Sequence, residues 1–387
     1  MYFHHLHFYV KDAAFWEAWF RHKLGFHPAL PPVLSPGAIT QAKAPSLEPT
    51  ILTQGNIEIR LSVPQHAPHV AQYLSQHPPG LADIAFATTQ FDAVFATAQQ
   101  QGAALLAPVS RLPSGQRQCQ LQGWAHLRHT LIEVSADWLQ GQNPSQKPLQ
   151  KLTPPSDAAQ SDTAQSETLP SNLLSLIDHV VINVPQGELS AAVRWYQTVF
   201  GLQFGQSFEI NTANSGLRSQ VLVHPEGTLQ LPINEPSSAN SQIQEFLHHN
   251  RGAGVQHVAL RAQDAVGAIA HFRSQGLQLL DVPLTYYEDL NERSDCPLRD
   301  LSAISKQQLL LDWNSSGEQG MLLQTFTRPI FAEPTFFFEI IERSNYRENG
   351  QLKVAQGFGE GNFQALFEAI ERSQMERGSL SSQHKRA

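Results

Sequence analysis

Hydrophobic and polar residues alternate in two stretches that open the two halves of the chain. Residues 3–10 (FHHLHFYV) and 177–184 (IDHVVINV) are short and rich in aromatic and β-branched residues, and each predicts a strand. A helical pattern follows each strand, over residues 13–23 and over residues 188–200. In the second helix the apolar positions form one stripe, and Gly201 is the expected stop. The stripe consists of Leu189, Val193, Tyr196 and Phe200.

A second pair of matching stretches lies further along each half. Residues 81–86 (LADIAF) correspond to residues 255–260 (VQHVAL), and a glycine closes the following helix at the same distance in both. The repeat predicts an α+β fold of tandem βαβββ modules, two in each half. Such modules curl their strands into open, barrel-like domains, and a cleft inside one of them can hold a metal and a small ligand.

The two domains are expected at residues 1–140 and 173–387. Residues 141–172 between them are rich in Pro, Ser, Gln and Thr. Such a stretch cannot bury enough apolar surface to offset its ordering entropy, so it predicts a flexible linker or a long surface loop.

Composition and charge narrow the class of protein. The 387 residues are 41% hydrophobic and 16% charged, which suits a soluble globular enzyme. The net charge of −8 and the lack of a basic block argue against nucleic acid or an anionic membrane as partner. Cys119 and Cys296 belong to different halves, and the N-terminus does not read as a signal peptide. A reducing cytoplasm is therefore the expected location.

The candidate chemistry centres on a glutamate within an aromatic strand. Glu339 lies in residues 336–341 (FFFEII), where a buried carboxylate needs a cation or a strong donor. His179 and His257 occupy equivalent places in successive modules, so the three side chains predict a metal site. Two imidazoles and one carboxylate leave positions open and suit non-haem Fe(II). Hydrolytic zinc is the competitor, but the chain has no H-E-x-x-H motif to supply a general base.

The last predicted helix begins after a glycine-rich stretch, residues 357–361 (GFGEG). Asn362 is its expected N-cap, and its apolar stripe consists of Phe363, Leu366, Phe367 and Ile370. The glycines would let the helix move, so it is expected to cover the cleft as a lid. A helix that simply packs on the sheet is the alternative.

These motifs resemble a known family. The second half is similar to 4-hydroxyphenylpyruvate dioxygenase, of the vicinal-oxygen-chelate superfamily, whereas the first half matches only in its module pattern. The matching stretches are residues 177–181 (IDHVV), 215–219 (SGLRS), 231–236 (LPINEP), 241–244 (SQIQ), 252–257 (GAGVQH), 322–326 (LLQTF), 337–341 (FFEII) and 357–363 (GFGEGNF).

The resemblance implies an Fe(II)- and O2-dependent oxidoreductase with His179, His257 and Glu339 as iron ligands. Its reaction would convert 4-hydroxyphenylpyruvate to homogentisate and CO2 by oxidative decarboxylation, ring hydroxylation and side-chain migration. That reaction serves tyrosine catabolism or quinone and tocopherol synthesis. The family also implies a homodimer or homotetramer formed through the first domain. The polar catalytic positions would be Ser219, Asn234, Gln242, Gln256 and Gln324. The substrate-binding positions would be Pro232, Phe326, Phe337, Phe358, Asn362 and Phe363.

Three alternatives stay open on the sequence. Hydroxymandelate synthase resembles this family in ligands and substrate but hydroxylates the benzylic carbon, although Pro232 and Asn234 follow the dioxygenase pattern. A non-enzymatic ligand-binding member of the superfamily is the second alternative, and an extradiol ring-cleaving dioxygenase is the third. In the first half, His5, Asp83 and Glu133 stand at the places that match the iron ligands. A vestigial or second metal site there is conceivable.

Overall fold

The computed structural model describes residues 1–29, 48–142, 172–212, 215–226, 229–313 and 320–378. The elements of the first half are β1 (Tyr2–Tyr9), α1 (Ala13–Leu24), β2 (His27–Pro28), β3 (Thr50–Gln54), β4 (Ile57–Ser62), α2 (Pro68–Gln76), β5 (Gly80–Thr88), α3 (Phe91–Gln100), β6 (Leu105–Arg111), β7 (Arg117–Gln122), β8 (Arg128–Glu133) and α4 (Ala136–Gln142).

The second half repeats this order and adds several elements. Its repeated part consists of β9 (Leu174–Asn183), α5 (Leu189–Phe200), β10 (Gln203–Asn211), β11 (Gly216–Val223), β12 (Gln230–Pro236), α6 (Gln242–Asn250), β13 (Gly254–Ala262), α7 (Ala265–Ser274), β14 (Leu310–Trp313), β15 (Met321–Phe326) and β16 (Phe337–Arg343). The additions are α8 (Leu284–Glu292), α9 (Ser302–Gln307), β17 (Asn345–Glu348), β18 (Gln351–Val354), the 3-10 turn η2 (Glu360–Asn362) and α10 (Phe363–Glu376).

The strands form two eight-stranded sheets with the same order of modules. The first sheet runs β2-β3-β4-β1-β5-β8-β7-β6, and the second runs β10-β11-β12-β9-β13-β16-β15-β14. The predicted α+β fold of tandem βαβββ modules is therefore confirmed. The stripe on α5 is buried, and Gly201 ends that helix in the left-handed conformation, as predicted. Most of the predicted linker lies outside the described residues, so the domain boundaries stay a prediction.

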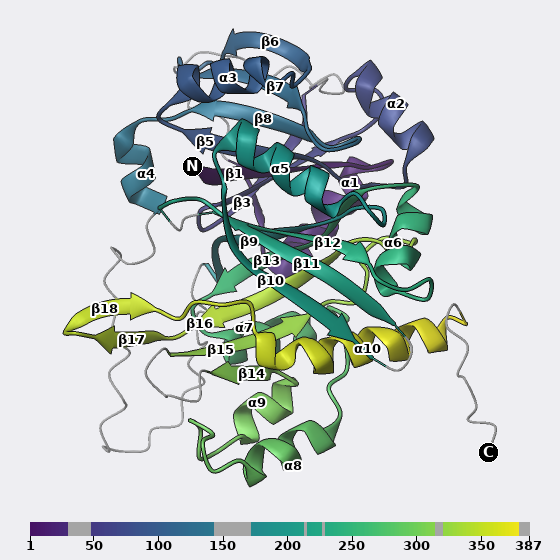
Figure 1. Cartoon of the computed structure of the whole chain (residues 1–387), viewed down its shortest axis with the longest axis vertical. Coiled ribbons are helices and arrows are strands. Elements are labelled where there is room, and N and C mark those ends of the chain that lie inside the picture. Colours follow the sequence, from purple (N-terminus) through teal and green to yellow (C-terminus); the bar gives the residue numbers. More distant parts are fainter. Residues whose placement is uncertain (30–47, 143–171, 213–214, 227–228, 314–319, 379–387) are drawn as a thin grey trace, which may run out of the picture.

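The two sheets share one hydrophobic core because each half sends a helix toward the other. Helix α1 follows the first strand, and its Phe20 packs against Phe338 on the back of the second sheet, with ring centroids 6.0 Å apart. Helix α5 does the reverse, and its Phe200 packs against Phe86 of the first sheet at 4.9 Å. Figure 1 shows α5 beside the strands of the first sheet, next to α3 and β8. The backs of the two sheets are thus buried in this shared core, and the inner faces of the sheets point the other way.

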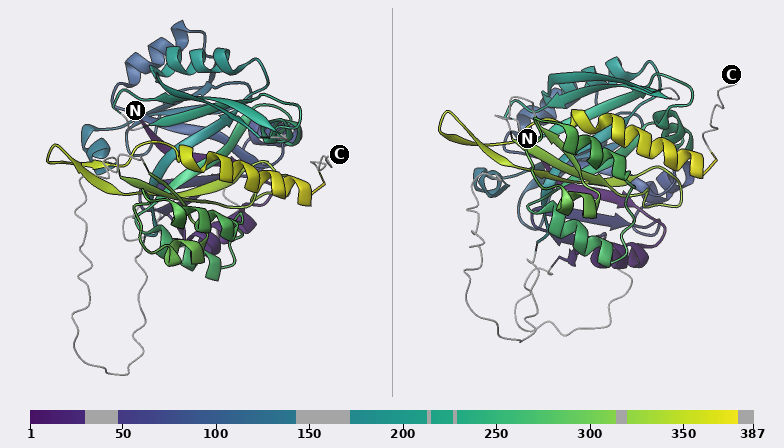
Figure 2. Two further views of the ribbon diagram at one scale, coloured as in Figure 1. Left: turned by 60° about the horizontal axis from the view of Figure 1, so that its bottom comes forward. Right: turned by 90° about the horizontal axis from the view of Figure 1, so that it is seen from below.

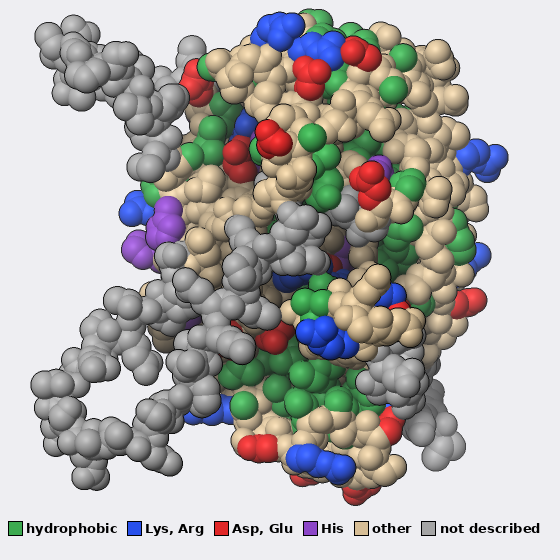
Figure 3. All heavy atoms as spheres, turned by 90° about the vertical axis from the view of Figure 1, so that its left-hand side faces the viewer, with side chains coloured by type: hydrophobic (Ala, Val, Ile, Leu, Met, Phe, Trp, Pro, Cys, Tyr) green, Lys and Arg blue, Asp and Glu red, His purple; other side chains and the backbone are tan. Residues whose placement is uncertain are grey.

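Helix α10 crosses the second sheet near its inner face, and the β17–β18 hairpin projects from the opposite side of the molecule, away from the C-terminal end of α10 (Figure 2). In the part of the chain that the structure describes, no helix is long and apolar enough to cross a membrane. Acidic and basic side chains are interspersed on the face drawn in Figure 3. This mixture agrees with the absence of a basic block in the sequence.

Candidate metal centre

Three metal-ligating side chains lie on three neighbouring strands at the centre of the second sheet. Ala259 on β13 is paired with His179 on β9 at one side and with Glu339 on β16 at the other. His257 precedes Ala259 by two residues and therefore lies on the same face. The register of the sheet thus brings together three ligands that are far apart in the sequence.

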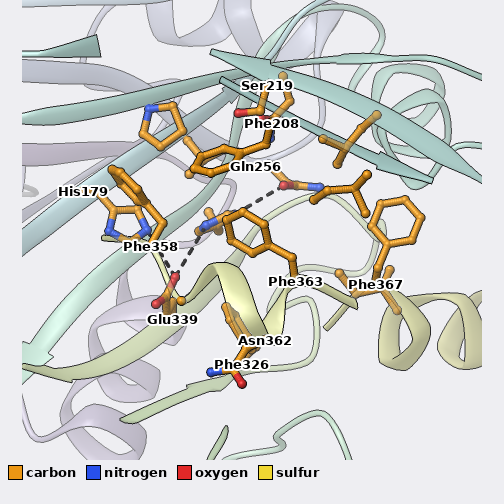
Figure 4. A pocket seen from close by; sticks show the side chains of 18 of the residues that line it. His179, Phe208, Ser219, Gln256, Phe326, Glu339, Phe358, Asn362, Phe363 and Phe367 are labelled. Atoms are coloured by element: carbon orange, nitrogen blue, oxygen red, sulfur yellow. Dashed lines mark hydrogen bonds and ion pairs between the residues drawn. The ribbon is translucent and has the colours of Figure 1, made fainter. Parts of the chain in front are cut away.

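The geometry of these side chains suits a metal ion. The Nε2 atom of His179 lies 3.2 Å from Oε2 of Glu339, and Nε2 of His257 lies 3.7 Å from the same oxygen. All three side chains are buried, and their ligand atoms lie within 4.8 Å of one another. Figure 4 shows His179 and Glu339 facing each other at one end of a cavity. Two imidazoles and one carboxylate fit a first-row transition metal and leave coordination positions open.

A buried carboxylate, Asp178, holds the first ligand in place. It accepts hydrogen bonds from Arg343 at 2.6 and 2.8 Å and from Arg261 at 2.6 and 2.9 Å, and it lies 3.1 Å from Nδ1 of His179. Asp178 is the extra residue of a β-bulge between β9 and β13, which lets it contact the adjacent His179. A proton held on Nδ1 leaves Nε2 free to bind a metal.

Burial and charge act in opposite directions on the pKa values of Asp178 and His179. Burial alone would raise the pKa of Asp178, but Arg343 and Arg261 hold that pKa well below its ordinary value. Burial alone would lower the pKa of His179, but the carboxylates of Glu339 and Asp178 outweigh it and raise the pKa to about 9. Burial and the neighbouring His179 lower the pKa of His257 well below its ordinary value. Without a metal, His179 is thus protonated at neutral pH and His257 is not.

A second hydrogen-bonded chain connects the centre to the start of α10. Gln324 donates to Oε1 of Glu339 at 2.9 Å and to the carbonyl of Phe358 at 3.0 Å, and it accepts from Asn362 at 3.0 Å. Gly359 has a φ of +74°, and a Cβ at that position would overlap the side chain of Gln324. Asn362 stands at the N-cap position of α10, as predicted, but its side chain does not cap the helix. Its side chain makes no capping bond and is committed to Gln324 and to the hydroxyl of Tyr286.

One cavity joins the ligand triad to α10 and encloses about 710 Å³ when its open mouth is included. Figure 4 shows Phe363 and Phe367 of α10 pointing into it from the side away from His179. Every residue that the sequence suggested for the site lines this cavity. The polar ones are Ser219, Asn234, Gln242, Gln256 and Gln324, and the others are Pro232, Phe326, Phe337, Phe358, Asn362 and Phe363. Their individual roles stay predictions.

The structure adds residues that the sequence reasoning missed. Additional lining residues are Val181, Phe208, Ile210, Leu217 and Val221. The period-two pattern of β10 and β11 could have predicted most of them. Leu217, Ser219 and Val221 are two residues apart and therefore share one face of β11. No sequence signal pointed to Arg261 and Arg343 as partners of Asp178. That contact depends on the register of three strands.

The residues of the first half that the sequence suggested do not form a common site, and one of them is misplaced. Glu133 pairs with Thr88, five residues after Asp83, whereas Glu339 pairs with Ala259, two residues after His257, so Glu133 does not stand at the place of Glu339. Glu133 is bound to Arg117 at 2.7 Å. Asp83 accepts hydrogen bonds from the backbone of Thr130 at 2.9 Å and from Gln120 at 2.7 Å. His5 is grouped instead with His4 on β1 and Glu58 on β4.

Comparisons with known proteins agree with this geometry. The model of the Glyoxalase/Bleomycin resistance protein/Dioxygenase superfamily matches residues 176–293. A 4-hydroxyphenylpyruvate dioxygenase of Xenopus tropicalis is 33% identical over 401 residues, which cover 98% of this chain and 93% of that protein. A 4-hydroxyphenylpyruvate dioxygenase of Legionella pneumophila is 42% identical over 209 residues, or 54% of this chain and 57% of that protein.

Two solved structures share the fold. A mutant of 4-hydroxymandelate synthase from Streptomyces coelicolor matches with a TM-score of 0.72 and 26% identity, over 96% of this chain and 98% of that chain. A fusion of a xylose isomerase-like TIM barrel with a 4-hydroxyphenylpyruvate dioxygenase matches with a TM-score of 0.68 and 23% identity. That match covers 97% of this chain and 52% of the fusion.

Replacing the orienting carboxylate should weaken the metal site. We expect Asp178→Asn to lower metal affinity about 10- to 100-fold, because His179 loses the partner that fixes its ring and its tautomer. Competition with a chelator measures this. The matched control is Glu235→Gln, a change to another buried carboxylate of the same sheet that bonds backbone N–H groups near α5. Equal losses of affinity in both variants would contradict an orienting role.

Metal binding should also depend on pH through His179. With a pKa of about 9 in the metal-free protein, this imidazole must release a proton before it can bind a metal. We expect Co²⁺ affinity to rise about tenfold per pH unit between pH 7 and 9 and to level off above pH 9. The visible absorption of bound Co²⁺ would follow the titration. An affinity that is flat over this range would show that His179 is not the titrating ligand.

Proposed function

The chain belongs to the 4-hydroxyphenylpyruvate dioxygenase family, and from this premise we propose that it converts 4-hydroxyphenylpyruvate and O2 to homogentisate and CO2. The observation that carries the proposal is the buried His179–His257–Glu339 triad at the end of an aromatic cavity. The similarity extends over both halves of the chain, so it includes all of the elements that build this cavity.

The metal that best suits this reaction is Fe(II), with His179, His257 and Glu339 as its ligands. When bound, Fe(II) supplies the O2 activation and the chelation of a 2-oxo acid on which oxidative decarboxylation depends. Two polar side chains next to the ligands hold them in place. Asp178 orients His179, and Gln324 donates a hydrogen bond to one oxygen of Glu339, so that the other oxygen faces the imidazoles.

Neutral polar groups are placed to bind the substrate without competing for the metal. Gln242 is buried at the start of α6, and its Oε1 has no hydrogen-bond partner. A buried acceptor of this kind costs free energy unless a ligand donates to it, and a phenol hydroxyl is such a donor. Gln256, Asn234 and Ser219 line the same cavity and are proposed to contact the remaining polar atoms of the substrate.

Aromatic side chains form the walls and exclude water. Phe337 stacks on the ring of His257 with centroids 4.8 Å apart, and Phe358 meets the ring of His179 edge-on at 5.2 Å. Phe326 and Phe363 complete the apolar surroundings. We infer that α10 acts as a lid, because its Phe363 closes the cavity and its start is bonded to Gln324 beside the metal ligands. The side chain of Leu366, on the predicted stripe of this helix, lies outside the described residues.

Formation of 4-hydroxymandelate is the alternative outcome, because the synthase structure matches over nearly the whole chain. The two reactions share the ligand triad and differ in the carbon that is hydroxylated. We also infer a homodimer or homotetramer and a reducing cytoplasmic location. The two cysteines support the location, since both are free in the structure.

The direct test is O2 uptake by the full chain, reconstituted with Fe(II) and given 4-hydroxyphenylpyruvate. We expect uptake with homogentisate formed, identified by mass and retention, and its loss in His179→Ala. His22→Ala, at an exposed histidine of α1, is the control and should keep full activity. Formation of 4-hydroxymandelate would identify the synthase, and iron binding without O2 uptake would favour a non-enzymatic binding protein.

The role of Gln242 can be tested within one helix. Gln242→Met removes the unpartnered acceptor with little change in volume, so kcat/KM should fall about tenfold, the equivalent of one hydrogen bond of roughly 1.4 kcal/mol. Gln244→Met makes the same change two residues away on the exposed side of α6. An unchanged kcat/KM in Gln242→Met would remove this residue from the substrate contacts.

A further inference from the structure

The first sheet contains a second cluster of metal-ligating side chains, formed by His4 and His5 on β1 and Glu58 on β4. Each residue offers one ligand atom, and the three atoms lie within 4.8 Å of one another. Across the described ranges, only this cluster and the His179–His257–Glu339 triad meet that condition. The proposed dioxygenase reaction uses the triad alone, so this cluster needs an explanation of its own.

A β-bulge brings two consecutive histidines together. On β1, Phe3 pairs with Phe86 and His5 pairs with Ala85, so His4 is an extra residue in the ladder. Consecutive strand residues normally point to opposite faces, and the bulge removes that separation. The Nδ1 atoms of His4 and His5 are consequently only 2.9 Å apart.

The same bulge occurs at the equivalent place in the second sheet. There Ile177 pairs with Leu260 and His179 pairs with Ala259, so Asp178 is the extra residue. His5 thus corresponds to the metal ligand His179, and His4 corresponds to the orienting Asp178. The first half has an imidazole where the second half has a carboxylate that is saturated by two arginines. A neutral imidazole can itself be a metal ligand, in place of the hydrogen bond that His4 and His5 share without a metal.

The distances around His5 suit a bound ion. With metal–nitrogen bonds of about 2.0–2.1 Å, two nitrogens at the observed separation subtend roughly 90° at the metal, the angle between neighbouring ligands in the tetragonal coordination of Cu²⁺. A slightly wider separation of the two rings gives the tetrahedral angle that Zn²⁺ prefers. Oε1 of Glu58 lies 3.8 Å from Nδ1 of His5, on the neighbouring strand. A small movement of its side chain would bring it to the same ion.

The surroundings fix the cluster and leave it accessible. His5 is buried, whereas His4 and Glu58 are half-buried, so an ion could enter from their side. Trp138 of α4 stacks on the ring of His4, with ring centroids 5.3 Å apart and an interplanar angle of 3°. Arg60 donates to Oε1 of Glu58 at 2.7 Å and competes with a metal for this carboxylate.

We propose that His4, His5 and Glu58 form a second metal site, which binds a late first-row divalent cation such as Zn²⁺ or Cu²⁺. Imidazole ligands favour these ions over Mg²⁺ and Ca²⁺, which prefer oxygen. The ion would fasten β1 to β4, close to the start of their parallel pairing at Leu6 and Ile59. Its role is structural, and it is independent of the iron triad.

The test counts Zn²⁺ bound tightly by the metal-free full chain, using competition with a chromophoric chelator. We expect two equivalents for the unaltered protein, one for His4→Ala, one for His257→Ala, and none for the double variant. Zn²⁺ should also raise the Tm of His257→Ala, in which only the proposed site remains. One equivalent in the unaltered protein, or two in His4→Ala, would overturn the proposal.

Two further variants separate a defined site from a general affinity of histidines. His7→Ala removes a histidine of the same strand whose Nε2 is engaged by Ser62 at 2.8 Å, and it should keep both equivalents. Arg60→Met frees the Glu58 carboxylate and removes a positive charge, so Zn²⁺ should bind several-fold more tightly. A gain of this kind cannot come from misfolding. Equal loss of Zn²⁺ in His4→Ala and His7→Ala, or unchanged affinity in Arg60→Met, would contradict the site.

Discussion

The carboxylate of Asp178 is the constraint on which the second half of the protein depends. A charge so deeply buried is tolerated only because Arg343, Arg261 and His179 all reach it. Two of these partners also contact other parts of the protein. His179 belongs to the metal site, and Arg343 also donates to the carbonyls of Ala355 and Gly357, just before α10. One buried charge therefore fixes both a ligand and the segment that leads to the lid.

The sequence could predict what depends on local pattern and on internal repetition. The βαβββ modules, the α5 stripe and the grouping of His179 and His257 with Glu339 all follow from alternation, spacing and repeat. The Asp178–Arg343 contact could not be predicted, because a one-residue bulge and the register of distant strands create it. Asn362 shows the same limit. Its sequence context suggests a helix cap, but tertiary hydrogen bonds to Gln324 and Tyr286 take its side chain instead.

The two halves show how one fold diverges while its backbone irregularities persist. Both first strands carry a bulge at the same place, yet the side chains around it differ. In the second sheet the bulge supports a ligand through a carboxylate held by arginines. In the first sheet, Asp83 on β5 accepts hydrogen bonds from Thr130 and Gln120, and the carboxylate of the proposed cluster is Glu58 on β4. The backbone has kept its shape while the chemistry has shifted to a neighbouring strand.

The packing of α1 against the second sheet and of α5 against the first has a consequence for biosynthesis. Phe20 leaves the ribosome long before Phe338, which packs against it, because more than half of the chain lies between the two residues. The part of the first core around Phe8 and Phe20 therefore stays exposed until β16 has been made, even if the strands of the first sheet have already paired. Such a surface invites aggregation or chaperone binding until the final strands arrive. The shared core that unites the finished protein thus makes the nascent chain vulnerable for as long as it is incomplete.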